Sequence, residues 1–193
     1  MRPPAGVFVH EHALLETDDV GAGTRIWAFA HVLGGARIGR DCNVCDHVFI
    51  EDDVSIGNDV TVKNGVLIFD RVTIEDEVFI GPGTVFTNDR LPRVTSPRQT
   101  PTLLPTLVRR GASIGANVTV LSDLTVGARA FVAAGSVVSG DVPPHGLMMG
   151  NPARRVGWVC SCGKRLPPSL RCECGRAFTL SGEVEGPLPA AGP

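Results

Sequence analysis

An aliphatic residue recurs at every sixth position along most of this chain; the run closes at Phe86 and resumes at Val108. The recurring positions are Val20, Ile26, Val32, Ile38, Val44, Ile50, Ile56, Val62, Ile68, Ile74, Ile80, Phe86, Val108, Ile114, Val120, Val126, Val132 and Val138. A helix would need apolar residues three and four apart, and a two-sided sheet would need strict alternation. A six-residue period instead predicts an all-β solenoid, in which each hexapeptide forms one flat side and one corner.

A second set of small or β-branched residues lies four positions after members of the first. It comprises Thr24, Ala30, Ala36, Cys42, Val48, Val54, Val60, Val66, Val72, Val78, Thr84, Ala112, Val118, Leu124, Ala130 and Ser136. Turn-forming triplets such as Gly57-Asn58-Asp59 lie between the two sets. Because neighbouring coils can bury both sets against one another, we expect these residues to form the core of a parallel β-helix.

The pattern divides the chain into one repetitive part and three that do not repeat. Pro143-Pro144 ends the solenoid, since proline supplies no backbone donor for a ladder. The last residues are rich in Gly and Pro without any period, which indicates disorder. The expected parts are a β-helix over 1–145 with a loop inserted over 87–107, a connecting turn or short helix over 146–157, a cysteine-rich module over 158–181 and a disordered tail over 182–193.

The inserted loop carries four prolines and three arginines. Loops of more than about 12–15 residues inside a compact domain are usually functional or disordered. One interpretation is a flexible loop that projects from a corner of the prism. The basic residues, the prolines and the position in the middle of the solenoid favour a functional flap.

Composition and charge limit the classes of partner. A hydrophobic fraction of 43% is sufficient for a core, and 23 glycines with abundant Val and Ile favour strands and tight turns. The formal net charge of −2 does not indicate the basic surface that binding of nucleic acid requires. The chain opens without a signal peptide and has no apolar run of membrane length. We therefore expect a soluble cytoplasmic protein with neither a nucleic-acid nor a membrane partner.

The repeat also predicts which polar residues stack. With three hexapeptides per coil, residues 18 apart lie above one another at the strand spacing of about 4.8 Å. One corner column then contains Asp52, Asp70 and Asn88, and Asn88 opens the inserted loop. Acidic groups this close repel one another, so a proton, a cation or a substrate ammonium would stabilise them. The alternative is an ordinary solvated corner.

The cysteines form two groups. Cys42 belongs to the second recurring set and should be buried as a small apolar residue. The other group lies in two Cys-x-Cys-Gly turns and consists of Cys160, Cys162, Cys172 and Cys174. Cytoplasmic thiols are usually reduced, so close pairs indicate metal before disulfide. We predict a zinc-ribbon-like module whose four thiolates leave no open position, and hence a structural zinc ion.

Segments such as Ile56-Gly-Asn-Asp-Val-Thr resemble the hexapeptide-repeat acyltransferases, and the resemblance covers roughly residues 14–145. It implies a left-handed β-helix and a homotrimer whose active sites lie between subunits. The usual crossover rule favours the right hand, so the left-handed winding is taken from the family alone.

Three longer motifs, TRIWAFAHV (24–32), EDEVFIGPGTVFTNDRLPR (75–93) and GNPARRVGW (150–158), are similar to those of nucleotide-linked 3-amino-sugar N-acetyltransferases. Enzymes of that group act on uridine- or thymidine-diphosphate sugars. The resemblance implies that Asn88 lies at the sugar amine, and the candidate proton acceptors are Asp70 and His31. The candidate substrate contacts are Arg25, Trp27, Asp52, Phe69 and Arg93, with Arg25, Trp27 and His31 expected along one face of the prism. The candidate coenzyme A contacts are Ala116, Ala134, Gly135, Arg154 and Arg155.

This reaction needs no reactive side chain for the attack itself, because a neutral amine attacks the thioester of acetyl-coenzyme A once the two are held in line. The remaining tasks are to accept the proton and to stabilise the oxyanion. His31 could be a general base, or it could be a surface residue. Alternative functions are O- or N-acyl transfer to another small acceptor and a non-catalytic scaffold. A γ-type carbonic anhydrase would need three converging His ligands, and the spacing of His31 and His47 does not provide them.

Overall fold

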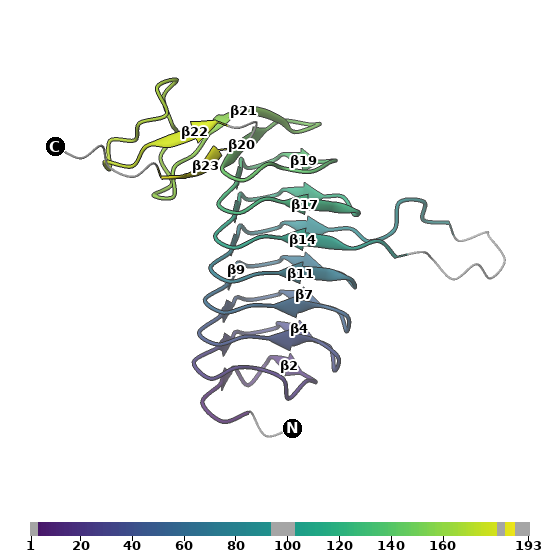
Figure 1. The fold of residues 1–193 in the computed structure, drawn as a ribbon. Coiled ribbons are helices and arrows are strands. Elements are labelled where there is room, and N and C mark those ends of the chain that lie inside the picture. The colour runs from purple at the N-terminus through teal and green to yellow at the C-terminus, as the bar shows by residue number, and fades with distance from the viewer. Residues whose placement is uncertain (1–3, 94–102, 181–183, 188–193) are drawn as a thin grey trace.

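Short strands, one in each hexapeptide, form three parallel sheets that wind around a common axis (Figure 1). The computed structural model describes residues 4–93, 103–180 and 184–187. Sheet A consists of β1 (Phe8–Val9), β3 (Arg25–Ile26), β6 (Asn43–Val44), β9 (Thr61–Val62), β12 (Phe79–Ile80), β15 (Ser113–Ile114), β18 (Phe131–Val132), β20 (Gly146–Met149) and β21 (Arg154–Trp158). Sheet B consists of β2 (Leu14–Leu15), β4 (His31–Val32), β7 (Phe49–Ile50), β10 (Leu67–Ile68), β13 (Val85–Phe86), β16 (Thr119–Val120) and β19 (Val137–Val138). Sheet C consists of β5 (Arg37–Ile38), β8 (Ser55–Ile56), β11 (Val72–Ile74), β14 (Thr106–Val108) and β17 (Leu124–Val126).

The core is formed by the two recurring sets of residues, all of which are buried. Each strand turns one side chain into the prism and the next outwards, because successive side chains of a strand point to opposite sides. Most neighbouring strands pair with an offset of 18 residues, so that Leu67 lies between Phe49 and Val85. The predicted β-helix, its core and its stacking are therefore confirmed.

The chain runs from sheet A to sheet B, then to sheet C and back to sheet A, and we call the three turns the A/B, B/C and C/A corners. The inserted loop leaves the prism at the B/C corner, between β13 and β14 (Figure 1). Strand β14 begins at Thr106, so residues 106–107 belong to sheet C and not to the predicted loop. The middle of the loop, 94–102, lies outside the described residues.

The segment 146–157 forms a β-hairpin, and the short helix considered for it is wrong. Strand β20 extends sheet A beyond β18, and β21 pairs with it in the antiparallel direction. Only the turn between them, over 150–153, matches the prediction. The physical reason is the open edge of the last coil, whose backbone groups need partners that a returning strand supplies. The described part of the chain contains no helix, and therefore none that could cross a membrane.

The tail predicted to be disordered over 182–193 contains a strand. Strand β23 (Val184–Pro187) pairs with β22 (Phe178–Leu180) in the antiparallel direction. Composition alone missed it because backbone pairing with a neighbouring strand does not require a periodic sequence. The rest of that tail, 182–183 and 188–193, lies outside the described residues.

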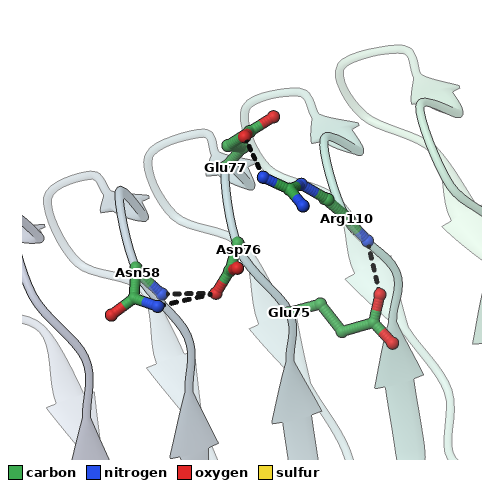
Figure 2. A network of polar contacts seen from close by, with 5 residues as sticks. All are labelled: Asn58, Glu75, Asp76, Glu77 and Arg110. Carbon is green, nitrogen blue, oxygen red and sulfur yellow. Dashed lines mark hydrogen bonds and ion pairs between the residues drawn. The ribbon is translucent and has the colours of Figure 1, made fainter.

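Polar side chains link successive coils at the C/A corner (Figure 2). Asp76 Oδ1 accepts from the backbone N–H and the side-chain amide of Asn58, at 2.7 and 3.2 Å. One coil further, Glu75 accepts from the backbone N–H of Arg110 at 2.8 Å, and the Arg110 guanidinium pairs with Glu77. These groups are largely exposed, so the ion pair contributes little to stability. The C/A corner is therefore an ordinary solvated corner.

Candidate functional site

The B/C corner carries the predicted polar column. Each of its acidic side chains reaches back to the preceding coil: Asp52 Oδ1 accepts from the Gly35 N–H, and Asp70 Oδ1 from the Asp53 N–H, both at 2.9 Å. Asn88 continues this pattern, since its side-chain amide donates to the backbone carbonyl of Asp70 at 3.4 Å. The three side chains are therefore stacked as the sequence predicted.

The described limbs of the inserted loop are fastened to this column. The Leu104 N–H donates to the Asn88 carbonyl at 2.9 Å and closes the base of the loop. On the outgoing limb, Arg90 donates to the Ser122 carbonyl at 3.1 Å and lies 3.6 Å from the Asp123 carboxylate. Arg93 lies further out along the loop and is exposed to solvent. The loop thus begins at the polar column, as a flap over that site would require.

Ser122, which the sequence analysis did not single out, lies one coil beyond Asn88. The pairing of Val85 with Thr119 gives this step an offset of 34 residues, because the loop is inserted here. Ser122 has no exposed surface, and its hydroxyl has no hydrogen-bond partner among the described residues. A buried hydroxyl without a partner is costly, which makes Ser122 a residue to test.

His31 lies on the outer face of sheet B. Its Nε2 is 2.9 Å from Glu16 Oε1, and its ring contacts Phe49 edge-on at 5.6 Å. Phe49 in turn contacts Phe69, at 6.2 Å, beside the polar column. Three strand pairings separate the row of His31 from that of Val85, which is about 14 Å at the usual strand spacing. One chain therefore does not bring His31 to Asn88.

Arg25 and Trp27 do not share a face with His31, and the prediction of a single face is wrong. Arg25 belongs to β3 of sheet A, whereas His31 belongs to β4 of sheet B. Trp27 lies at the corner between them and donates from Nε1 to Asn43 Oδ1 at 2.8 Å. The corner at residues 27–30 turns the chain from one sheet to the next, which the six-residue period does not reveal.

Three of the predicted coenzyme A residues, Ala116, Ala134 and Gly135, lie at the A/B corner of the later coils. The Gly135 N–H donates to the Ala116 carbonyl at 2.8 Å, so the two corners stack. At neighbouring Gly115, a Cβ would lie 2.5 Å from the backbone nitrogen of Ala134, so only glycine fits there. Small residues leave the backbone of this corner open to an approaching chain.

Arg154 and Arg155 project from β21 and are exposed. Arg154 donates to the Ala153 carbonyl at 3.0 Å. The Arg155 guanidinium lies 4.1 Å above the ring of Trp158, a cation–π contact. Both cations remain accessible to an anionic ligand.

Asn88 and Gly135 occupy different corners of the prism. The extended segment from Gly83 at the A/B corner to Asn88 at the B/C corner spans about 16 Å. A single chain therefore keeps the polar column and the glycine-rich corner apart.

The four cysteines of the C-terminal module converge. Their sulfur atoms all lie within 4.8 Å of one another, with Cys160 Sγ 3.5 Å from Cys174 Sγ and Cys162 Sγ 3.6 Å from Cys172 Sγ. Tetrahedral zinc with Zn–S bonds of about 2.3 Å places its sulfurs about 3.8 Å apart. The cluster therefore fits such an ion, and no other group of potential metal ligands converges in the part of the chain that is described.

Local backbone bonds position these thiols. The N–H of Gly163 donates to the Cys160 carbonyl at 2.8 Å, and that of Gly175 to the Cys172 carbonyl at 3.0 Å. Both glycines have positive φ, 85° and 88°, which explains the glycine in each Cys-x-Cys-Gly turn. The two turns are therefore equivalent and face each other.

The cysteine cluster contains one acidic thiol. The backbone N–H of Arg176, followed by the thiol of Cys172, lowers the pKa of Cys174 to about 6. The pKa of Cys172 moves the opposite way, to about 12: the backbone N–H of Cys174 lowers it, but burial and the neighbouring thiols outweigh this. A cation is the partner that would favour the thiolate form at all four positions.

Over 184 residues, 94% of this chain and 95% of the relative, the sequence is 50% identical to the dTDP-3-amino-3,6-dideoxy-α-D-galactopyranose 3-N-acetyltransferase of Aneurinibacillus thermoaerophilus. The chain belongs to the hexapeptide-repeat N-acetyltransferases. Residues 19–52 of this acetyltransferase also match the bacterial transferase hexapeptide family.

Solved structures support the same family. A variant of perosamine N-acetyltransferase from Caulobacter crescentus, solved with CoA and GDP-perosamine, is 25% identical with a TM-score of 0.60. The match covers 72% of this acetyltransferase but only 57% of that protein. A UDP-N-acetylglucosamine acyltransferase from Bacteroides fragilis shares the fold at 18% identity and a TM-score of 0.58, over 80% of this chain and 59% of the other.

Proposed function

We propose that this acetyltransferase moves an acetyl group from acetyl-coenzyme A to the amine of a nucleotide-linked 3-amino sugar. The observation that carries the proposal is the 50% identity, over nearly the whole chain, to an enzyme named for that reaction. A sugar nucleotide and CoA bound together to a related β-helix give further support. The nucleotide in this proposal is dTDP or UDP, and the proposed place of the reaction is the cytoplasm.

The reaction needs positioning more than reactive side chains. The neutral amine attacks the thioester carbonyl carbon, a C–N bond forms, and the C–S bond of the tetrahedral intermediate then breaks. Asn88 accepts a hydrogen bond from the amine through Oδ1 and directs the nitrogen lone pair to the thioester. Asp70, or His31 of a neighbouring subunit, accepts the amine proton, and the released thiolate of CoA is the final base.

Substrate binding uses the groups around the polar column. Asp52 and Phe69 border the sugar, and Arg93 brings a positive charge from the loop to the diphosphate. Arg25, on sheet A, and Trp27, at the A/B corner, make further contacts with the substrate.

Coenzyme A follows the A/B corner of the later coils. Ala116, Ala134 and Gly135 let the pantetheine arm approach backbone N–H groups, which stabilise the oxyanion. Arg154 and Arg155 pair with its phosphates. This site and Asn88 lie at different corners, so one chain cannot bring thioester and amine together. We infer a homotrimer in which the loop of one subunit completes the site of the next.

The four-cysteine module holds one structural zinc ion. Its small core, formed by Cys160, Leu166, Cys172 and Phe178, is separate from that of the solenoid. We infer that 1–145 and 158–181 are distinct folding units joined by the hairpin. The bound ion would supply folding free energy to the smaller unit and takes no part in acetyl transfer.

Product analysis tests the function. The protein should acetylate a dTDP- or UDP-linked 3-amino sugar with acetyl-coenzyme A, giving a product 42 mass units heavier, about the mass of one acetyl group minus a proton. A panel of sugars with amine or hydroxyl at the same carbon separates N- from O-acetylation. Failure to modify any amino sugar, with acetylation of another acceptor, would assign a different substrate. Failure of CoA to raise the melting temperature would favour a scaffold.

A further inference from the structure

The A/B corner has one residue of positive φ on each of six coils. They are Phe29, His47, Gly65, Gly83, Asn117 and Gly135. Glycine and asparagine tolerate this conformation, but a bulky side chain there is strained. Phe29 and His47 are the two ring residues at this corner, with φ of 60° and 59°, and only Phe29 has no polar group that could bond to the local backbone.

Burial does not compensate for the strain at Phe29, since 56% of this residue is exposed. Its ring instead lies in a stack. The His12 ring is 5.5 Å away at an interplanar angle of 15°, and the His47 ring is 5.0 Å away at 13°. Three nearly parallel rings thus continue along the corner at about the spacing of the coils. We call His12, Phe29 and His47 the ring ladder.

The ring ladder ends at an open position. The coil after His47 has Gly65 at the corner, where a Cβ would meet nothing within 4 Å. Because Gly65 has no side chain, no ring of this coil continues the stack beyond His47. A planar ligand above Gly65 would extend the ring ladder by one position.

We propose that the ring ladder and the open position at Gly65 form the stacking site for the planar base of the nucleotide in the acceptor substrate. The inference rests on the proposed function and names the part of the protein that binds the nucleotide. Aromatic platforms recognise bases through their π-faces with little dependence on base identity. A base stacked on the rings would give the exposed Phe29 side chain a binding role at a position where its backbone conformation is unfavourable.

The position of the ladder relative to the coenzyme A residues supports this occupant. Ala116, Ala134 and Gly135 lie at the same corner on later coils, and Gly65 and Gly83 lie between the two regions. The nucleotide base and coenzyme A would therefore bind along one corner of a subunit, and the sugar amine would reach Asn88 of a neighbouring subunit. The adenine of coenzyme A is also a planar base, so binding of each nucleotide is measured separately.

The test combines Phe29→Asn and His47→Asn, which remove a ring and keep a residue that tolerates positive φ. We expect each variant to bind dTDP and UDP about tenfold more weakly and to raise the KM for the amino sugar by a similar factor. CoA affinity, kcat and trimer mass should be unchanged, and the melting temperature of Phe29→Asn should be equal or higher. Phe79→Ala is the matched control, because Phe79 is 42% exposed on sheet A but contacts no ring of the ladder.

Unchanged dTDP and UDP affinity in both variants would overturn the proposal. Weakened CoA binding alone would overturn it as well, since the ladder would then hold adenine. Loss of the trimer in Phe29→Asn would show that another subunit covers the rings and would also overturn it. Because nucleotide titration needs no turnover, a wild-type protein that binds dTDP through Phe29 but acetylates no amino sugar would refute the proposed function alone.

Discussion

The side chain of Asn88 contacts the backbone of Asp70 and not the Asp70 carboxylate. The Asn88 amide donates to the Asp70 carbonyl at 3.4 Å, while the Asp70 carboxylate accepts from the Asp53 N–H at 2.9 Å. The first bond is long and hence weak, whereas the second fastens the corner. Asn88 can therefore turn towards a substrate at little cost, and one oxygen of Asp70 is already engaged in the fold.

Asn88→Ala should lower kcat by about 10²-fold, in the range for loss of one positioned catalytic group. The interaction with the amine is made mainly in the transition state, so the change falls on kcat. Asn58→Ala is the control, since that side-chain amide also bonds across coils but lies at the C/A corner, where its partner is the Asp76 carboxylate. Steady-state kinetics with both substrates measure the effect.

Full turnover with only a raised KM for the sugar would mean that Asn88 binds and does not direct the amine. The pH–rate profiles of Asp70→Asn and His31→Asn would then identify the proton acceptor. Loss of the acidic limb of the profile, on which the rate rises as the base loses its proton, would assign the role to the residue changed in that variant.

Ser122→Ala should raise the melting temperature by about 2–4 °C, because a buried hydroxyl without a partner costs about 1 kcal/mol or more. Ser136 provides the control: it is equally buried, but its Oγ accepts from the Gly150 N–H at 3.1 Å. Ser136→Ala leaves that donor unpaired and should lower the melting temperature. Equal losses in both variants would show that the Ser122 hydroxyl has a partner.

Purified protein should contain one zinc ion per chain, measured by elemental analysis. Cys160→Ser should lose the ion and unfold the module, with the solenoid still folded because the two cores are separate. Cys42→Ala should keep the zinc, since Cys42 is buried in the solenoid. Protein prepared without chelators that contains no metal would contradict the zinc site.

Acid should weaken the junction between solenoid and module through His145. Burial lowers the pKa of this histidine, while the bond between Nδ1 and the Val159 carbonyl, 2.9 Å long, opposes the shift. The unfolded chain therefore binds more protons just below its own pKa of about 6.5. The contribution to stability is complete above that pH and is lost as the pH falls through the folded pKa.

Melting curves between pH 7.5 and 5 test this sign. His145→Asn keeps a residue suited to the φ of 59° but does not titrate, so its melting temperature should vary less with pH. An identical pH dependence in both proteins would exclude His145 as the cause.

The sequence by itself determined the solenoid, its core and the stacking of Asp52, Asp70 and Asn88. A strict period repeats one local geometry, so the residues of each recurring set have the same environment on every coil. The cysteine pairs were equally informative, because their chemistry requires that they converge. The hand of the winding came from the family resemblance, since a period has no hand.

Only the tertiary structure decided what lies between and beyond the repeats. It separated Arg25 from His31 on two sheets, turned 146–157 into a hairpin on the open edge of sheet A and left the Ser122 hydroxyl without a described partner. It also aligned Phe29 with two imidazoles. These features depend on contacts between side chains and edges that the period does not encode, because corners and chain ends are shaped by their neighbours in space.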